Sequence, residues 1–426
     1  MTKTINYSTA SRPFIIASII LLFIGSFIGS IWLMSIFGIN LPSWLHGTLQ
    51  LHKMLQVDGF LTLLIMGIGY MIIPRFRNVQ LVSVKLVYVS FILILVSLSL
   101  QVIQSVRSDK DLSTEIMISR LVGILIFLIL LFWTLRIRPK LLRLSDYFIA
   151  LCLITLITVN LIDLSRNGYS NSLTQVLLWL LFPTLMIFGI EYKTLPSFLG
   201  YIRPRKTLAL ISFILISICI ISGLASLIFL NTLLLSMIFS FTFFASVLIF
   251  AIAIYAFGGF DNSEILLLIS GEKKARYNFI VVHIRLSFMF LLLGITIALL
   301  FFLVGPYYIF YDLAIHIIAI GFIGLTIALY LPLMLPPIIG KIVYFTNFNK
   351  IPLILIVISL CMRAAGDLFL GQPLSSSSEY VLNLHRILSY FFGLSGWLVV
   401  AAMFTFVIMI QRSMRNESNI SNDTAN

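Results

Sequence analysis

The five histidines of this sequence lie within or beside long apolar runs. His46 and His52 open the stretch HGTLQLHKMLQVDGFLTLLIMGIGYMIIPRF, which soon becomes almost entirely apolar. His316 lies within a later apolar run, and His385 stands just before the last one. A neutral imidazole can ligate a metal ion, exchange a proton or donate a hydrogen bond to a neighbouring helix. These four histidines are therefore the first candidates for chemistry in the chain.

Axial ligation of a haem iron is the chemistry that this pattern favours. A six-coordinate haem iron needs two neutral imidazoles that face each other from separate helices. It also needs small residues that let the flat macrocycle approach the backbone, and glycines follow both histidines at helical spacing: Gly59 and Gly67 after His52, Gly321 and Gly324 after His316. We predict that His52 and His316 ligate a haem of b type. The alternative is that each histidine donates a hydrogen bond between helices.

Further charged and metal-binding side chains are expected at a similar depth. Lys53, Arg363 and Arg386 are candidates to neutralise the haem propionates, because a cation pairs well with a carboxylate. His46 and His385 are candidates for a second metal ion, for which copper is one option, or for an exchangeable ligand. The alternative for both is a solvated position at the membrane interface.

The remaining ionisable residues each have a structural interpretation beside the functional one. Asp58 could belong to a proton path, or it could bond to a neighbouring helix. Arg363 and Asp367 are four residues apart and could form an ion pair within one helix. His283, with Arg285 beside it, is expected to be structural or interfacial.

The composition indicates that membrane-spanning helices position these residues. Of the 426 residues, 60% are hydrophobic and 10% are charged, and the mean hydropathy is +1.11. A soluble domain carries about 25% charged residues. The net charge of +13 would suggest nucleic acid as a partner in a soluble protein, but here we expect membrane lipid and no nucleic acid. The single cysteines Cys152, Cys219 and Cys361 form no metal-binding or disulfide pattern.

The predicted fold is all-α, a polytopic bundle of about 12 transmembrane helices. Apolar runs of about 20 residues suit a hydrocarbon layer roughly 30 Å thick. We predict one transmembrane domain over residues 1–411 and a polar cytoplasmic tail over 412–426. The expected spans are 13–38, 53–73, 82–106, 118–136, 144–164, 173–191, 207–228, 233–257, 278–304, 310–334, 351–370 and 387–411.

Most of the 28 Lys and Arg residues fall in alternate connections between these spans. Because cytoplasmic loops are rich in Lys and Arg, this bias predicts a protein of the cytoplasmic membrane with both termini inside the cell. The first apolar run lacks a small-residue cleavage site and is expected to remain as a helix. This orientation brings His46, His52, His316 and His385 to one depth near the outer face, and His283 to the cytoplasmic side.

The opening stretch also resembles a known family. LHKMLQVDGFLTLLIMGIGYMIIPRF is similar to the second helix of the NnrS family, membrane haem-copper proteins linked to nitric oxide metabolism, with matches at His52, Met54, Gly59, Phe60 and Pro74. GIEYKTLPSFLG (189–200), HIIAIGFIGLTIALYLPLML (316–335), ISLCMRAAGDLF (358–369) and LSGWLVVAAMFTFVI (394–408) resemble later parts of that family in the same order. GIGYMIIPRF has a more distant likeness to haem-copper oxidase subunit I.

The resemblance implies haem binding and a role in nitric oxide response or respiratory-type redox chemistry, with an electron-donor protein as a candidate partner. In the oxidases, helices two and ten supply the low-spin haem ligands, which supports His52 and His316 as the pair. Gln50 and Lys53 depart from the family's His-x-His-Glu run, and the sixth and seventh helices lack histidine, so a full binuclear oxidase centre is not expected. No catalytic residue is assigned.

Two other classes of function remain open. A secondary transporter could use Asp58, Arg363 and Asp367 along a polar path near the outer face. It predicts paired broken helices in two related halves, which the sequence does not display. A sensor or assembly subunit without catalysis is the third class. There is no Walker loop, GxGxxG after a strand, GxSxG or HExxH in the chain.

Overall fold

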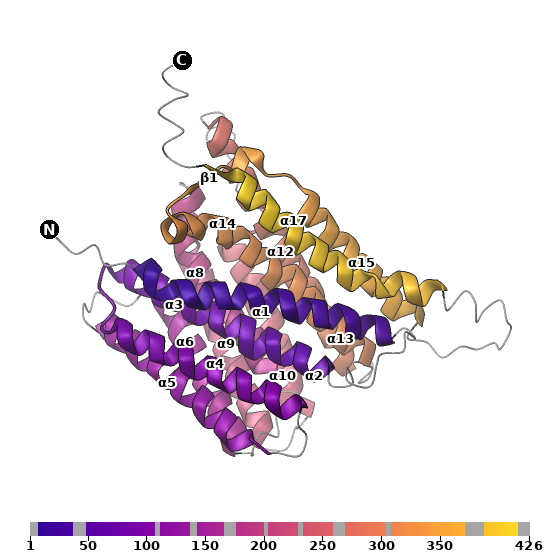
Figure 1. The fold of residues 1–426 in the computed structure, drawn as a ribbon, viewed down its shortest axis with the longest axis horizontal. Coiled ribbons are helices and arrows are strands. Elements are labelled where there is room, and N and C mark those ends of the chain that lie inside the picture. The colour runs from indigo at the N-terminus through magenta and orange to yellow at the C-terminus, as the bar shows by residue number, and fades with distance from the viewer. Residues whose placement is uncertain are drawn as a thin grey trace. The chain divides into compact units, whose positions relative to one another are not determined.

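The computed structural model describes residues 7–36, 48–106, 111–136, 143–165, 176–199, 203–228, 233–258, 269–303, 308–370 and 387–415. Within these residues, 12 helices are long and apolar enough to cross a membrane (Figure 1). Each overlaps one of the 12 expected spans, with ends that differ by at most seven residues. The prediction of an all-α polytopic fold is confirmed, and the chain is a multi-pass membrane protein.

The chain forms two compact units, and each has its own core. Unit 1 comprises residues 1–35 and 40–186, and unit 2 comprises 36–39 and 187–426. The expectation of a single domain over residues 1–411 stays a prediction.

Unit 1 is built around the second spanning helix. Its elements are α1 (Tyr7–Ile36), α2 (Thr48–Met54), η2 (Leu55–Leu61), α3 (Thr62–Arg77), α4 (Val84–Val106), α5 (Ser113–Arg136), α6 (Leu144–Ser165), η3 (Leu177–Leu181) and the start of α8 (Phe182–Leu199). Tyr70 of α3 is fully buried, with its ring 5.4 Å from that of Phe14 and 5.0 Å from that of Phe127. Its hydroxyl lies 2.9 Å from that of Ser90. One aromatic residue thus connects α3 with α1, α4 and α5.

Unit 2 contains the remaining spans. Its elements after α8 are α9 (Lys206–Ile228), α10 (Leu233–Ala253), α12 (Gly271–Leu303), α13 (Tyr308–His316), η4 (Ile317–Gly324), α14 (Leu325–Ile339), β1 (Ile342–Val343), η5 (Phe345–Asn347), α15 (Ile351–Leu370), α17 (Ser395–Ser413) and β2 (Met414–Arg415). The rings of Phe188 and Phe250 stack at 3.8 Å, and Phe288 lies 6.2 Å from Phe250 and 5.8 Å from Phe322. These four fully buried rings join α8, α10, α12 and η4.

Three of the described helices contain a π-helical stretch: η2, η3 and η4. His52 lies three residues before η2, and His316 directly precedes η4. A π-helical turn holds more residues than an α-helical one, and such turns occur frequently at functional sites. The 3.6-residue period assumed for both histidine-bearing helices is therefore interrupted just after each histidine.

The C-terminal end of the last span is tied to unit 2 by a short ladder. Ile342 and Val343 of β1 pair antiparallel with Arg415 and Met414 of β2. Helix α17 extends to Ser413, two residues beyond the expected end of the transmembrane domain at residue 411. Residues 416–426 lie outside the described part of the chain.

Candidate functional site

His52 is held against the first helix by a hydrogen bond to the backbone. Its Nδ1 lies 2.7 Å from the carbonyl oxygen of Gly25 in α1. Because a carbonyl oxygen only accepts hydrogen bonds, Nδ1 is the donor, and in the neutral ring the lone pair is then on Nε2. A bond of this kind fixes the tautomer and orientation of metal-ligating histidines.

The glycine-bearing face of the second span contacts α1. A Cβ atom built on Gly29 would lie 2.5 Å from the His52 ring, and one on Gly25 would lie 2.8 Å from the Gln56 amide. On the second span itself, a Cβ atom built on Gly67 would lie 2.8 Å from the Phe14 side chain of α1. The glycines of this face were predicted to let a macrocycle approach the backbone. In the structure they let α1 pack closely against the second span.

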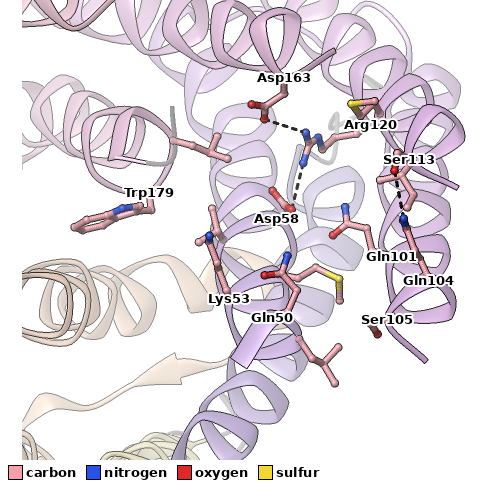
Figure 2. Close-up of a pocket in the computed structure, with 16 residues that line it drawn as sticks. Gln50, Lys53, Asp58, Gln101, Gln104, Ser105, Ser113, Arg120, Asp163 and Trp179 are labelled. Carbon is pink, nitrogen blue, oxygen red and sulfur yellow. Dashed lines mark hydrogen bonds and ion pairs between the residues drawn. The ribbon is translucent and has the colours of Figure 1, made fainter. Parts of the chain in front are cut away.

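A polar cavity of about 390 Å³ lies on another face of the second span, within unit 1 (Figure 2). Side chains from α2, η2, α4, α5, α6 and η3 line it. Its polar lining consists of Gln50, Lys53, Asp58, Gln101, Gln104, Ser105, Ser113, Arg120 and Asp163, and its apolar lining of Leu51, Met54, Val57, Ile116, Met117, Leu178 and Trp179.

Arg120 links two carboxylates at one side of this cavity. Its Nη1 lies 3.2 Å from Oδ2 of Asp58, and its Nη2 lies 3.4 Å from Oδ2 of Asp163, as Figure 2 shows. All three side chains are at least four-fifths buried, at 14%, 18% and 10% exposure. We call Asp58, Arg120 and Asp163 the Arg120 cluster.

Lys53 brings a second positive charge to the cavity wall from the helix that carries Asp58. Among the described residues it forms no ion pair. With Lys53 ionised, the charged lining sums to zero while its two signs remain apart. Such a lining suits a ligand that carries both signs of charge.

Two roles were open for Asp58, a proton path or a bond to a neighbouring helix. In the structure Asp58 forms an ion pair with Arg120 of α5. Arg120 and Asp163 were not predicted as site residues. The available signal was their position: an arginine and an aspartate within apolar spans are costly unless they are paired.

Unit 2 holds a second charged group, around Arg363 of α15. Nε and Nη2 of Arg363 lie 3.1 Å and 2.5 Å from Oδ2 of Asp312 in α13. Asp367, the expected partner four residues along the helix, is farther, at 4.0 Å from Nε. The close partner is therefore Asp312, which the sequence analysis missed because it lies 51 positions away in the chain.

His316 belongs to the same group. Its Nδ1 lies 2.8 Å from the carbonyl oxygen of Asp312 and 3.4 Å from the carboxylate of that residue. Both neighbours are acceptors, so Nδ1 again carries the proton and Nε2 the lone pair in the neutral ring. A carboxylate beside the donor nitrogen helps to fix the tautomer and orientation of the ring, as in the second shell of many metal sites.

Several predicted site residues are not brought together by the structure. His46, His385 and Arg386 lie outside the described residues. His52 belongs to unit 1 and His316 to unit 2, so their pairing stays a prediction. Within the described ranges no three His, Cys, Asp or Glu side chains form a metal-binding group. His283 is buried, and its Nδ1 donates to the carbonyl of Phe279 at 2.8 Å. Its structural or interfacial role stays a prediction.

Fold and site together define a class, a multi-pass helical membrane protein with buried charges in both units. No protein-family model matches the chain, and no curated protein is significantly similar to it.

Proposed function

We propose that this chain is an integral membrane haem protein, similar to the NnrS family, that acts in nitric oxide response or respiratory-type redox chemistry. One observation carries the proposal: His52 and His316 each donate Nδ1–H to a backbone carbonyl, which leaves Nε2 as the metal-binding nitrogen. The chemistry of this donor set fits an iron with two axial imidazoles.

The other predicted residues take supporting roles in this proposal. Lys53, Arg363 and Arg386 would pair with the propionates. The Arg363 guanidinium would then pair with both a propionate and the Asp312 carboxylate. His46 and His385 would hold a copper ion or serve as exchangeable ligands. When bound, the haem would supply redox-active iron that exchanges electrons with a donor protein or binds a small ligand such as nitric oxide.

An absorption spectrum, reduced minus oxidised, of the protein purified from haem-replete cells tests the proposal. We expect a Soret band that His52→Ala and His316→Ala each shift or abolish. His283→Ala is the matched control, because its Nδ1 is also bonded to a carbonyl four residues earlier, and it should keep the band. No band in the wild type, or a band unchanged in both test variants that still elute as monodisperse protein, would overturn the axial pair.

The proposal includes location in the cytoplasmic membrane with both termini inside the cell. The supporting observation is that Lys and Arg are concentrated in alternate connections between the spans.

A secondary transporter is the second candidate, and the polar cavity of unit 1 favours it. Cavities at membrane depth lined by paired charges mark substrate paths in transporters. Uptake of a labelled solute into liposomes by haem-free protein, reduced in Asp58→Asn, would support transport. Uptake equal to that of empty liposomes for every solute class would exclude it.

A further inference from the structure

We infer that the unit 1 cavity binds a zwitterionic amino acid with an apolar side chain. The inference names a ligand class for the site on which the transporter candidate rests, but it concerns binding alone and does not require transport or haem.

The charges of the cavity are the first argument. The Arg120 cluster places two carboxylates beside one guanidinium at one side of the cavity. Lys53 adds a positive charge to the cavity wall and is ion-paired to none of the described carboxylates. A ligand ammonium would be attracted to the cluster and a ligand carboxylate to Lys53. A ligand with only one charge would gain one attraction and meet one repulsion in the same low-dielectric space.

The apolar lining is the second argument. Met54 is buried, as are Ile116, Met117, Leu178 and Trp179, and all five line the same cavity as the charged groups. Small-molecule sites typically combine such an apolar wall with a few polar groups that fix orientation. An aliphatic or aromatic side chain would remove this surface from contact with water, at about 25 cal/mol per Å² buried.

The size and polar lining are consistent with such a ligand. The volume of about 390 Å³ lies in the range of small-molecule sites, roughly 300–1,000 Å³. The Gln104 amide donates to the hydroxyl of Ser113 at 3.2 Å, and the Gln101 amide to that of Ser97 at 3.4 Å. These bonds hold two amides of the lining in place, which reduces the entropy lost when a polar ligand binds.

Three probes of the same shape separate the charge requirements: L-leucine, isopentylamine, which lacks the carboxylate, and 4-methylpentanoate, which lacks the ammonium. Isothermal titration of the full chain in detergent measures each affinity. We expect leucine to bind at least about tenfold more tightly than either analogue, since one charge-assisted hydrogen bond contributes about 1.5–3 kcal/mol.

Charge variants then make the test specific to this cavity. Lys53→Gln should weaken leucine binding about tenfold to a hundredfold and shift the preference toward isopentylamine. Asp58→Asn should weaken leucine binding and shift the preference toward 4-methylpentanoate. Lys85→Gln, which removes an exposed lysine of α4 away from the cavity lining, is the matched control and should leave all three affinities unchanged.

Two outcomes would overturn the inference: leucine binding no tighter than that of both analogues, or the same order of the three affinities in both charge variants. Circular dichroism and size-exclusion profiles like those of the wild type would show that a variant is folded. The haem proposal is tested by the absorption spectrum and transport by uptake, so each of the three can fail separately.

Discussion

At the scale of single residues, ion pairing stabilises several of the buried charges. Arg77 and Asp146 are an example, because both side chains are buried, at 7% and 8% exposure, and lie 2.8 Å apart. Asp146 also accepts a bond from the backbone nitrogen of Arg143 at 2.8 Å. The end of α3 is thereby fastened to the start of α6, while Asp58 and Asp163 lie toward the opposite ends of the same two spans.

Removing one member of this pair should cost more than removing both. Arg77→Met leaves the Asp146 carboxylate buried without its cation, and we expect it to lower the free energy of unfolding by about 3–5 kcal/mol. The double variant Arg77→Met with Asp146→Leu should recover most of this loss, because apolar residues often replace a buried ion pair at little cost.

Thermal and denaturant unfolding in detergent measures both effects. Arg75→Met is the control, since Arg75 lies in the same turn of α3 but is exposed, and its effect should stay within about 0.5 kcal/mol. If the double variant is no more stable than Arg77→Met, the pair does not act through charge compensation.

At the scale of elements, α1 fixes the position of His52. The backbone of α1 approaches the imidazole so closely that a Cβ on Gly29 would lie 2.5 Å from the ring. Gly29→Ala must therefore displace His52 from its bond to the carbonyl of Gly25. We expect a loss of about 1–3 kcal/mol in unfolding free energy and, in haem-loaded protein, a shifted Soret band.

Gly258→Ala is the control for this prediction, because nothing lies within 4 Å of a Cβ at that position. An unchanged melting temperature and spectrum for Gly29→Ala would mean that α1 yields and does not position His52.

The spanning helices could be predicted from sequence because span length and hydropathy are local properties, set by the bilayer for each run separately. The π-helical stretches could not, because nothing in LQVDGFL (55–61) or IIAIGFIG (317–324) distinguishes a π-helical turn from an α-helical one. The partners of the buried charges were also missed. Arg120 meets Asp163 across 43 positions and Arg363 meets Asp312 across 51, and spacing within one helix indicates only partners three or four residues away.

At the scale of the whole molecule, the two units share a plan. Each contains a histidine just before a π-helical stretch, and Nδ1 of that histidine donates to a backbone carbonyl. Each also holds one arginine near two carboxylates. A haem that binds the native chain and not the unfolded one would stabilise it by an amount that rises with the logarithm of its affinity.

The orientation of the whole chain is the prediction on which every depth in the proposal depends. If both termini are cytoplasmic, the connection before α5 is outside the cell and the one before α12 is inside. Asp111 and Ser270 are exposed residues of these two connections, outside the spanning helices.

In a background without Cys152, Cys219 and Cys361, a membrane-impermeant maleimide should label Asp111→Cys on intact cells and Ser270→Cys only after permeabilisation. Neither change adds or removes Lys or Arg, and Asp contributes little to orientation, so the variants should insert as the wild type does. Labelling of both after permeabilisation controls for thiol accessibility. The reverse pattern on intact cells would place the Arg120 cluster at the cytoplasmic face and contradict a site that faces outward.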